Sequence, residues 1–153
     1  MAPISELTKN VLIAEDDDDD FEIFSDAIQQ LSITVILSRA ENGDILIKLL
    51  SEKHPPDMLF LDINMPCKDG QSCLVEIRSN RKYDSLPIII YTSRRDFDAV
   101  EFCFRKGANV YVYKPHSYSE LVDVLEKIFA IDWEKMMYYP TFSQFVLNAR
   151  GPI

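Results

Sequence analysis

Side chains that could carry out phosphoryl transfer follow four short apolar runs of this sequence. They are carboxylates, a hydroxyl and an ammonium group: Glu15, Asp16, Asp62, Thr92 and Lys114. An aspartate can accept a phosphoryl group covalently. Neighbouring carboxylates repel one another unless a proton or a cation neutralises them, and Mg²⁺ prefers oxygen ligands while leaving room for a phosphoryl oxygen. A bound metal and the ammonium group would then stabilise the charge on the transferring group.

For these groups to meet, the segments between them must fold into one sheet. Short apolar runs predict strands at 11–14, 35–37, 58–61, 88–91 and 110–113, and amphipathic stretches predict helices at 21–31, 45–50, around 74–77, 97–104 and 117–129. This alternation predicts an α/β fold with a doubly wound, five-stranded parallel sheet and helices on both faces. Gly107 is expected to close the fourth helix. Ligands of such sheets bind outside the carboxyl ends of the strands, where the polar side chains would converge.

Composition restricts the classes of protein to which the chain can belong. Its 153 residues fit one domain, and a formal net charge of −9 argues against direct binding of nucleic acid or of a membrane surface. No apolar run approaches the roughly 20 residues that span a bilayer, and the first ten residues lack the features of a signal peptide. Cys67, Cys73 and Cys103 show no disulfide or zinc spacing, which favours reduced thiols and a cytoplasmic location.

The residues at the expected strand ends form motifs in a specific order and spacing. They are Glu15-Asp16, Leu61-Asp62-Ile63-Asn64-Met65-Pro66 with Asp69-Gly70, Tyr91-Thr92-Ser93 and Tyr111-Val112-Tyr113-Lys114-Pro115. With these motifs the chain closely resembles the receiver domain of two-component response regulators over residues 10–131. The resemblance implies a flavodoxin-like sheet with the strand order 2-1-3-4-5.

The resemblance also implies which residues hold the metal and the phosphoryl group. Asp62 would be the phosphoacceptor. Asp62, Asp16 and the backbone carbonyl of Asn64 would bind Mg²⁺ or Mn²⁺ directly, and Glu15 would hold the metal through water. Glu15 departs from the aspartate usual at this position of the family, but its longer reach suits an outer role.

Three further residues would sense or stabilise the phosphoryl group by the same resemblance. Thr92 would bond a phosphoryl oxygen, and the ring of Tyr111 would turn inward or outward with Thr92. Lys114 would pair with the carboxylate or with the phosphoryl group. A cis bond to Pro115 would aim Lys114, since cis peptide bonds are nearly confined to proline.

The expected function is that of a single-domain response regulator. Residues 1–131 would form the phosphoacceptor domain, which would receive a phosphoryl group on Asp62 from a sensor histidine kinase or a phosphotransfer protein. It would signal by phosphorylation-dependent binding of a protein target, and would catalyse only its own phosphorylation and dephosphorylation. The sequence names neither the kinase nor the target, and it leaves a homodimer open.

Three other functions use similar groups. A phosphohydrolase of the haloacid-dehalogenase type needs a second aspartate two residues after the nucleophile, where this chain has Asn64. A flavodoxin-like FMN carrier needs a phosphate cradle in its first loop, where the acidic run 15–20 would repel a phosphate. A degenerate receiver that only binds a partner would not need the complete set of matched site residues.

Several neighbouring residues have simpler expected roles. Most of the run Asp17–Asp20 would be solvated or would cap the first helix, since acidic side chains favour helix N-termini. His54 and His116 match no motif position and are interpreted as structural, and Cys67 is interpreted as an inert thiol. Ser93 fits a site role and an ordinary hydroxyl at a strand end equally well.

Residues 132–153 form an aromatic-rich C-terminal extension that is too short for a separate DNA-binding or catalytic output domain. Its large apolar residues are too dense for a disordered linker: Trp133, Met136, Met137, Tyr138, Tyr139, Phe142, Phe145, Val146 and Leu147. The extension could pack on its own domain or dock on a second subunit or a partner, and we expect packing in cis. Pro140 should end any helix that continues past Trp133, so that Thr141–Leu147 forms a separate short element.

Overall fold

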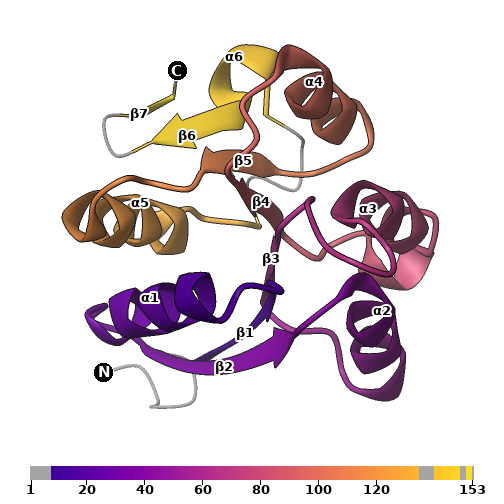
Figure 1. Cartoon of the computed structure of the whole chain (residues 1–153), viewed down its shortest axis with the longest axis horizontal. Coiled ribbons are helices and arrows are strands. Elements are labelled where there is room, and N and C mark those ends of the chain that lie inside the picture. Colours follow the sequence, from indigo (N-terminus) through magenta and orange to yellow (C-terminus); the bar gives the residue numbers. More distant parts are fainter. Residues whose placement is uncertain (1–7, 135–139, 149–150, 153) are drawn as a thin grey trace.

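The sheet of this protein follows the predicted order and continues beyond it (Figure 1). The computed structural model describes residues 8–134, 140–148 and 151–152. The strands are β1 (Thr8–Ala14), β2 (Thr34–Ala40), β3 (Met58–Leu61), β4 (Ile88–Thr92), β5 (Val110–Tyr113), β6 (Val146–Asn148) and β7 (Gly151–Pro152). Within these residues the order is β2-β1-β3-β4-β5-β6-β7, and every neighbouring pair is parallel except β6 with β7. The first five strands confirm the expected order 2-1-3-4-5.

Helices cover both faces of the sheet, as predicted. They are α1 (Asp18–Gln29), α2 (Gly43–Glu52), α3 (Gly70–Arg78), α4 (Phe97–Arg105), α5 (Tyr118–Ala130) and the single turn α6 (Phe142–Phe145), with a short 3₁₀ helix η2 (Arg81–Tyr83) after α3. In Figure 1, α1 and α5 lie on one side of the sheet, and α2, α3 and α4 lie on the other.

Strands β1 to β6 each contribute side chains to two hydrophobic clusters, because successive residues of a strand point to opposite faces. Val11 and Ile13 pack with α1 and α5, whereas Leu12 and Ala14 pack with α2, α3 and α4. Burial on both faces explains why the strands read as continuous apolar runs.

The helices begin and end at residues suited to these positions. Each of α1 to α5 starts after a polar residue whose side chain accepts a hydrogen bond from a backbone N–H of the first turn: Asp17, Asn42, Asp69, Asp96 and Ser117. Gly107 follows α4 with a φ of 97°, which a residue with a side chain rarely adopts. The expected cap at the acidic run and the expected stop at Gly107 are both confirmed.

The described part of the C-terminal extension packs on its own chain. β6 pairs with β5, placing Val146 opposite Tyr111 and Leu147 opposite Val112, and Phe145 of α6 is fully buried. The prediction of a separate short element packed in cis is confirmed for these residues, while Met136, Met137, Tyr138 and Tyr139 lie outside the described residues. None of the described helices is long and apolar enough to cross a membrane.

Candidate functional site

The acidic residues at the ends of β1 and β3 come together as the sequence predicts. Parallel pairing places Ala14 opposite Leu61, and the backbone N–H of Asp62 donates to the Ala14 carbonyl at 3.1 Å. Carboxylate oxygens of Glu15, Asp16 and Asp62 consequently lie within 4.8 Å of one another. Glu15 and Asp62 are buried, whereas Asp16 is exposed, so the cluster opens to solvent on the Asp16 side.

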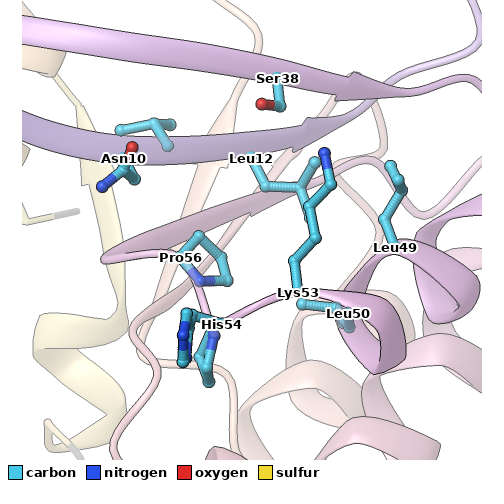
Figure 2. Close-up of a pocket in the computed structure, with 10 residues that line it drawn as sticks. Asn10, Leu12, Ser38, Leu49, Leu50, Lys53, His54 and Pro56 are labelled. Atoms are coloured by element: carbon cyan, nitrogen blue, oxygen red, sulfur yellow. The ribbon is translucent and has the colours of Figure 1, made fainter.

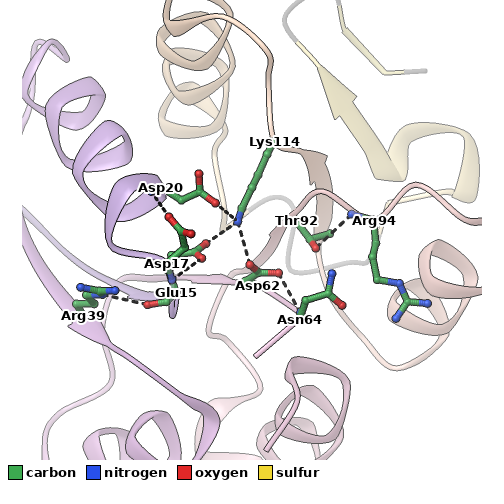
Figure 3. Close-up of polar contacts among 9 residues, drawn as sticks. All are labelled: Glu15, Asp17, Asp20, Arg39, Asp62, Asn64, Thr92, Arg94 and Lys114. Atoms are coloured by element: carbon green, nitrogen blue, oxygen red, sulfur yellow. Dashed lines mark hydrogen bonds and ion pairs between the residues drawn. The ribbon is translucent and has the colours of Figure 1, made fainter. Parts of the chain in front are cut away.

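Lys114 joins this cluster from the end of β5 (Figure 3). Its Nζ lies 2.9 Å from Glu15 Oε2 and 2.9 Å from Asp62 Oδ2. A third carboxylate, that of Asp20, lies 2.8 Å from the same nitrogen. The Lys114 ammonium group thus forms ion pairs with three carboxylates, and its single positive charge can neutralise only one of them.

Burial and crowding shift the protonation of these groups. Burial raises the pKa of Glu15 to about 7, with the charge of Asp62 acting in the same direction and the hydrogen bond from Lys114 opposing it. Burial alone would lower the pKa of Lys114, but hydrogen bonds to Asp20 and Glu15 and the charge of Asp62 outweigh it and raise that pKa above its usual range. A buried glutamate that holds its proton more tightly than usual thus lies beside a lysine that keeps its charge.

The loop after Asp62 is held close to the acceptor by backbone contacts. The N–H of Asn64 donates to Asp62 Oδ1 at 3.0 Å, and the N–H of Gly70 donates to the Ile63 carbonyl at 3.1 Å. A Cβ atom at Gly70 would collide with the backbone of Asp62 and Ile63. Glycine at this position lets α3 begin directly against the acceptor.

Thr92 and Tyr111 are linked through the backbone of Arg94. Thr92 is buried at the end of β4, and its Oγ1 accepts a long hydrogen bond of 3.4 Å from the Arg94 N–H. The Tyr111 hydroxyl donates to the Arg94 carbonyl at 2.8 Å, and the Tyr111 ring is fully buried. The Tyr111 side chain is thus held inside the fold, and its role as a switch stays a prediction.

Comparison with known proteins identifies the family. The sequence model of the response regulator receiver domain matches residues 11–126. The chain belongs to the response regulator receiver family. One relative is the probable C4-dicarboxylate response regulator DctR of Bacillus subtilis, which is 32% identical over 76% of this chain and 50% of DctR. Another is the transcriptional regulatory protein PdtaR of Mycobacterium tuberculosis, which is 35% identical over 60% of this chain and 42% of PdtaR. The chain thus spans half or less of the length of these two curated relatives.

Solved structures show the same fold. A putative response regulator from Chloroflexus aurantiacus has 28% identity and a TM-score of 0.69, covering 81% of this chain and 99% of that one. The Mn²⁺-bound form of response regulator Rcp1 has 24% identity and a TM-score of 0.73, covering 87% and 99%. The phosphorylated cyanobacterial phytochrome response regulator RcpA has 21% identity and a TM-score of 0.76, covering 88% and 99%. No comparison supports the phosphohydrolase alternative, and a receiver domain is a signalling module.

The receiver family implies a divalent cation, and the residues of this chain fit one. Glu15, Asp16 and Asp62 offer only carboxylate oxygens within 4.8 Å of one another, which are the ligands that Mg²⁺ and Mn²⁺ prefer. The exposed side of Asp16 leaves access for water. The role of the Asn64 carbonyl in this site stays a prediction.

One expectation about Lys114 is wrong. No peptide bond between described residues is cis, so the bond from Lys114 to Pro115 is trans. Strand pairing positions Lys114 instead, because its backbone N–H donates to the Thr92 carbonyl at 2.8 Å.

The sequence interpretation missed Arg39 and the specific role of Asp20. Arg39 is the penultimate residue of β2, which pairs with β1, and its Nε donates to the Glu15 carbonyl at 3.0 Å. Its Nη1 pairs with Asp18 at 2.9 Å, and its guanidinium lies 4.8 Å from the centroid of the Phe21 ring. The sequence did offer a signal for Arg39, because it is a positively charged residue near the end of β2. The strand order 2-1-3 places that end of β2 beside Glu15.

The residues interpreted as structural lie away from the acceptor or on the surface. His54 lines a cavity of about 360 Å³ between β1, β2 and the end of α2, together with Leu12, Leu50 and Lys53 (Figure 2). This cavity is near the amino end of β3, and its lining contains no predicted site residue. His116 is exposed and contacts Arg95 at 3.2 Å. The thiol of Cys67 is exposed.

Proposed function

We propose that this receiver accepts a phosphoryl group on Asp62 in a reaction that needs Mg²⁺ or Mn²⁺. The donor would be a sensor histidine kinase or a phosphotransfer protein. The phosphorylated domain would signal by binding a protein target. The observation that carries the proposal is the position of Asp62, which is buried beside two further carboxylates and lies 2.9 Å from the Lys114 ammonium.

The side chains around Asp62 support this chemistry. A carboxylate oxygen of Asp62 would attack phosphorus while the donor's imidazole leaves. Lys114, whose Nζ lies 2.9 Å from Asp62, would neutralise negative charge on the acyl phosphate. The Thr92 hydroxyl, which accepts a long hydrogen bond of 3.4 Å from the Arg94 N–H, would bond a phosphoryl oxygen. A bound divalent cation would supply charge stabilisation and orient the phosphoryl oxygens.

Location and partner class complete the proposal. The three cysteines are free, which fits a reducing compartment, and we place the protein in the cytoplasm. The net charge of −9 opposes direct binding of nucleic acid, so the target would be a protein. A homodimer is compatible with this assignment.

Intact-mass spectrometry after treatment with acetyl phosphate and Mg²⁺ tests the proposal. The chain should gain the mass of one phosphoryl group that hydroxylamine removes, and Asp62→Asn should gain none while keeping its circular dichroism spectrum. Asp57→Asn, which alters an exposed aspartate before β3, is the matched control and should still be labelled. Labelling of Asp62→Asn, or labelling in EDTA, would refute the assignment. Steady turnover of p-nitrophenyl phosphate would favour a phosphohydrolase.

A further inference from the structure

Asp20 differs from the two other carboxylates that pair with Lys114 in its origin and in its exposure. Glu15 and Asp62 follow the ends of β1 and β3, and their side chains are 0% and 5% exposed. Asp20 belongs to the first turn of α1, and its side chain is 39% exposed. Its Oδ2 lies 2.8 Å from Lys114 Nζ (Figure 3). Asp20 is therefore the partner of Lys114 that lies nearest the solvent.

The first turn of α1 fixes this position of Asp20. The side chain of Asp17 caps the helix and accepts a hydrogen bond of 2.8 Å from the Asp20 N–H. Asp18 pairs instead with Arg39 at 2.9 Å, and Asp19 is exposed. Of the aspartates at positions 17–20, Asp20 is thus the one whose carboxylate reaches Lys114.

The Asp20 carboxylate does not belong to the group that fits a divalent cation. Among the described residues, that group consists of Glu15, Asp16 and Asp62. The contact of the Asp20 carboxylate is its ion pair with Lys114. A cation bound by the other three residues would leave the Asp20 oxygens available as hydrogen-bond acceptors.

Phosphorylation of Asp62 would release Asp20 from this ion pair. A phosphorylated side chain carries about 1.5 to 2 negative charges at neutral pH, and the Oδ2 atom of Asp62 already lies 2.9 Å from Lys114 Nζ. Lys114 would pair with the phosphoryl oxygens in preference to Asp20, because ion pairs of exposed side chains are weak. Asp20 would then be an ionised carboxylate that faces the phosphoryl group from the solvent side.

A water molecule between Asp20 and the phosphorus atom would be oriented for attack. An ionised carboxylate only accepts hydrogen bonds, so the water would point a hydrogen toward Asp20 and an oxygen lone pair toward phosphorus. Asp20 and Asp62 contact the same nitrogen at 2.8 and 2.9 Å. Their carboxylates are therefore close enough for one water molecule to bridge Asp20 and a phosphoryl group on Asp62.

We infer that Asp20 is the general base for hydrolysis of phosphorylated Asp62, and that it thereby limits the lifetime of the phosphorylated state. This inference rests on the proposed function. The water oxygen bonds to phosphorus while the bond between phosphorus and the Asp62 oxygen breaks, and the electron pair of that bond returns to the Asp62 carboxylate. The water proton passes to Asp20, and inorganic phosphate leaves. A positioned general base contributes about 10²–10⁴-fold to the rate of such a step.

The rate at which Asp20→Asn loses its phosphoryl group tests this role. The full-length chain is labelled with acetyl phosphate and Mg²⁺, acetyl phosphate is removed by gel filtration, and the remaining label is followed by intact-mass spectrometry. Asp20→Asn should lose the label about a hundredfold more slowly than the wild type, because an amide cannot take up the proton. Asp20→Ala is a second variant without a base and should be slow as well.

Asp19→Asn is the matched control for these variants. It removes the same charge from the neighbouring exposed residue and should lose its label at the wild-type rate. Circular dichroism should be the same for all these chains, because Lys114 keeps its contacts with Glu15 and Asp62 when Asp20 is replaced.

The solvent isotope effect separates proton transfer from a change of charge beside Lys114. The wild type should lose its label more slowly in D₂O than in H₂O, because a proton moves to Asp20 in the hydrolysis step. The effect should be smaller in Asp20→Asn. A slow Asp20→Asn variant with the isotope effect of the wild type would mean that Asp20 acts only through Lys114, and it would overturn the assignment as general base.

Two other results would overturn the inference and leave the proposed function intact. One is loss of the label from folded Asp20→Asn at the wild-type rate. The other is equally slow loss from Asp19→Asn, which would assign the effect to the overall charge of the acidic run. A wild-type chain that takes up no label would instead refute the proposed function, and this role of Asp20 with it.

Discussion

Lys114 Nζ lies 2.9 Å from Asp62 Oδ2, although the two residues are 52 positions apart in the chain. The same nitrogen also contacts Glu15 and Asp20. In the absence of a metal, this single ammonium is what offsets the repulsion among the buried carboxylates. Removing it should therefore affect folding as well as phosphorylation.

Lys114→Met should lower the free energy of unfolding in EDTA by about 3–5 kcal/mol, because buried carboxylates lose their counter-charge. Mg²⁺ should restore part of this loss by binding the folded state. Urea unfolding with and without Mg²⁺ measures both effects. Lys48→Met, at an exposed lysine of α2, is the control and should change little. Equal unfolding free energies of the two variants in EDTA would show that Lys114 does not offset the repulsion among the carboxylates.

The pKa of Glu15 predicts an unusual pH dependence in the absence of metal. Burial raises this pKa from 4.5 to about 7. Between these values the folded chain keeps a proton that the unfolded chain has released, so stability should fall as pH rises through this range. Urea unfolding in EDTA at several pH values measures the slope.

Glu15→Gln separates this effect from the titration of other groups. The variant cannot release a proton at this position, so its unfolding free energy should vary less with pH between 4.5 and about 7. Glu41→Gln, at an exposed glutamate after β2, should retain the wild-type slope. An unchanged slope in Glu15→Gln would assign the pH dependence to another residue.

The difference between Glu15 and Arg39 shows what could be predicted from the sequence. Glu15 follows directly on an apolar run, so the expected strand placed it at the site. Arg39 lies within the run that forms β2, and its contact with the Glu15 carbonyl becomes visible only when β2 is known to lie beside β1. Asp20 belongs to a run of five aspartates, and only the first turn of α1 distinguishes it by turning it toward Lys114.

The extension shows a second limit of prediction. Its aromatic density indicated packing, and Pro140 indicated a break before a short element. The strand β6 has only three residues and forms because β5 offers an open edge. A strand this short carries no periodicity that a sequence pattern could reveal.

Arg39 should position the acidic loop for metal binding. Replacing it with a neutral residue would also remove a positive charge and thereby favour a cation, so Arg39→Lys is the more informative change. Lysine keeps the charge but cannot reproduce the paired contacts of the guanidinium with the Glu15 carbonyl and Asp18. The variant should bind Mg²⁺ about tenfold more weakly, as found for residues that orient metal ligands.

Isothermal titration calorimetry with Mg²⁺ measures this affinity directly. Arg81→Lys, at an exposed arginine of η2, is the matched control and should bind like the wild type. A wild-type dissociation constant in Arg39→Lys would mean that Arg39 stabilises the loop without orienting the metal ligands.

Thr92→Ala should separate phosphorylation from its effect on Tyr111. The variant keeps Asp62 and Lys114, so acetyl phosphate should still label it in intact-mass spectra. It lacks the hydroxyl that would be drawn to the phosphoryl oxygen, and the path from Thr92 through Arg94 to the Tyr111 hydroxyl should no longer respond. The assigned NMR signals of the Tyr111 ring should shift on phosphorylation in the wild type and in Ser93→Ala, whose hydroxyl is exposed, but not in Thr92→Ala. A normal Tyr111 shift in labelled Thr92→Ala would show that the ring responds by another route.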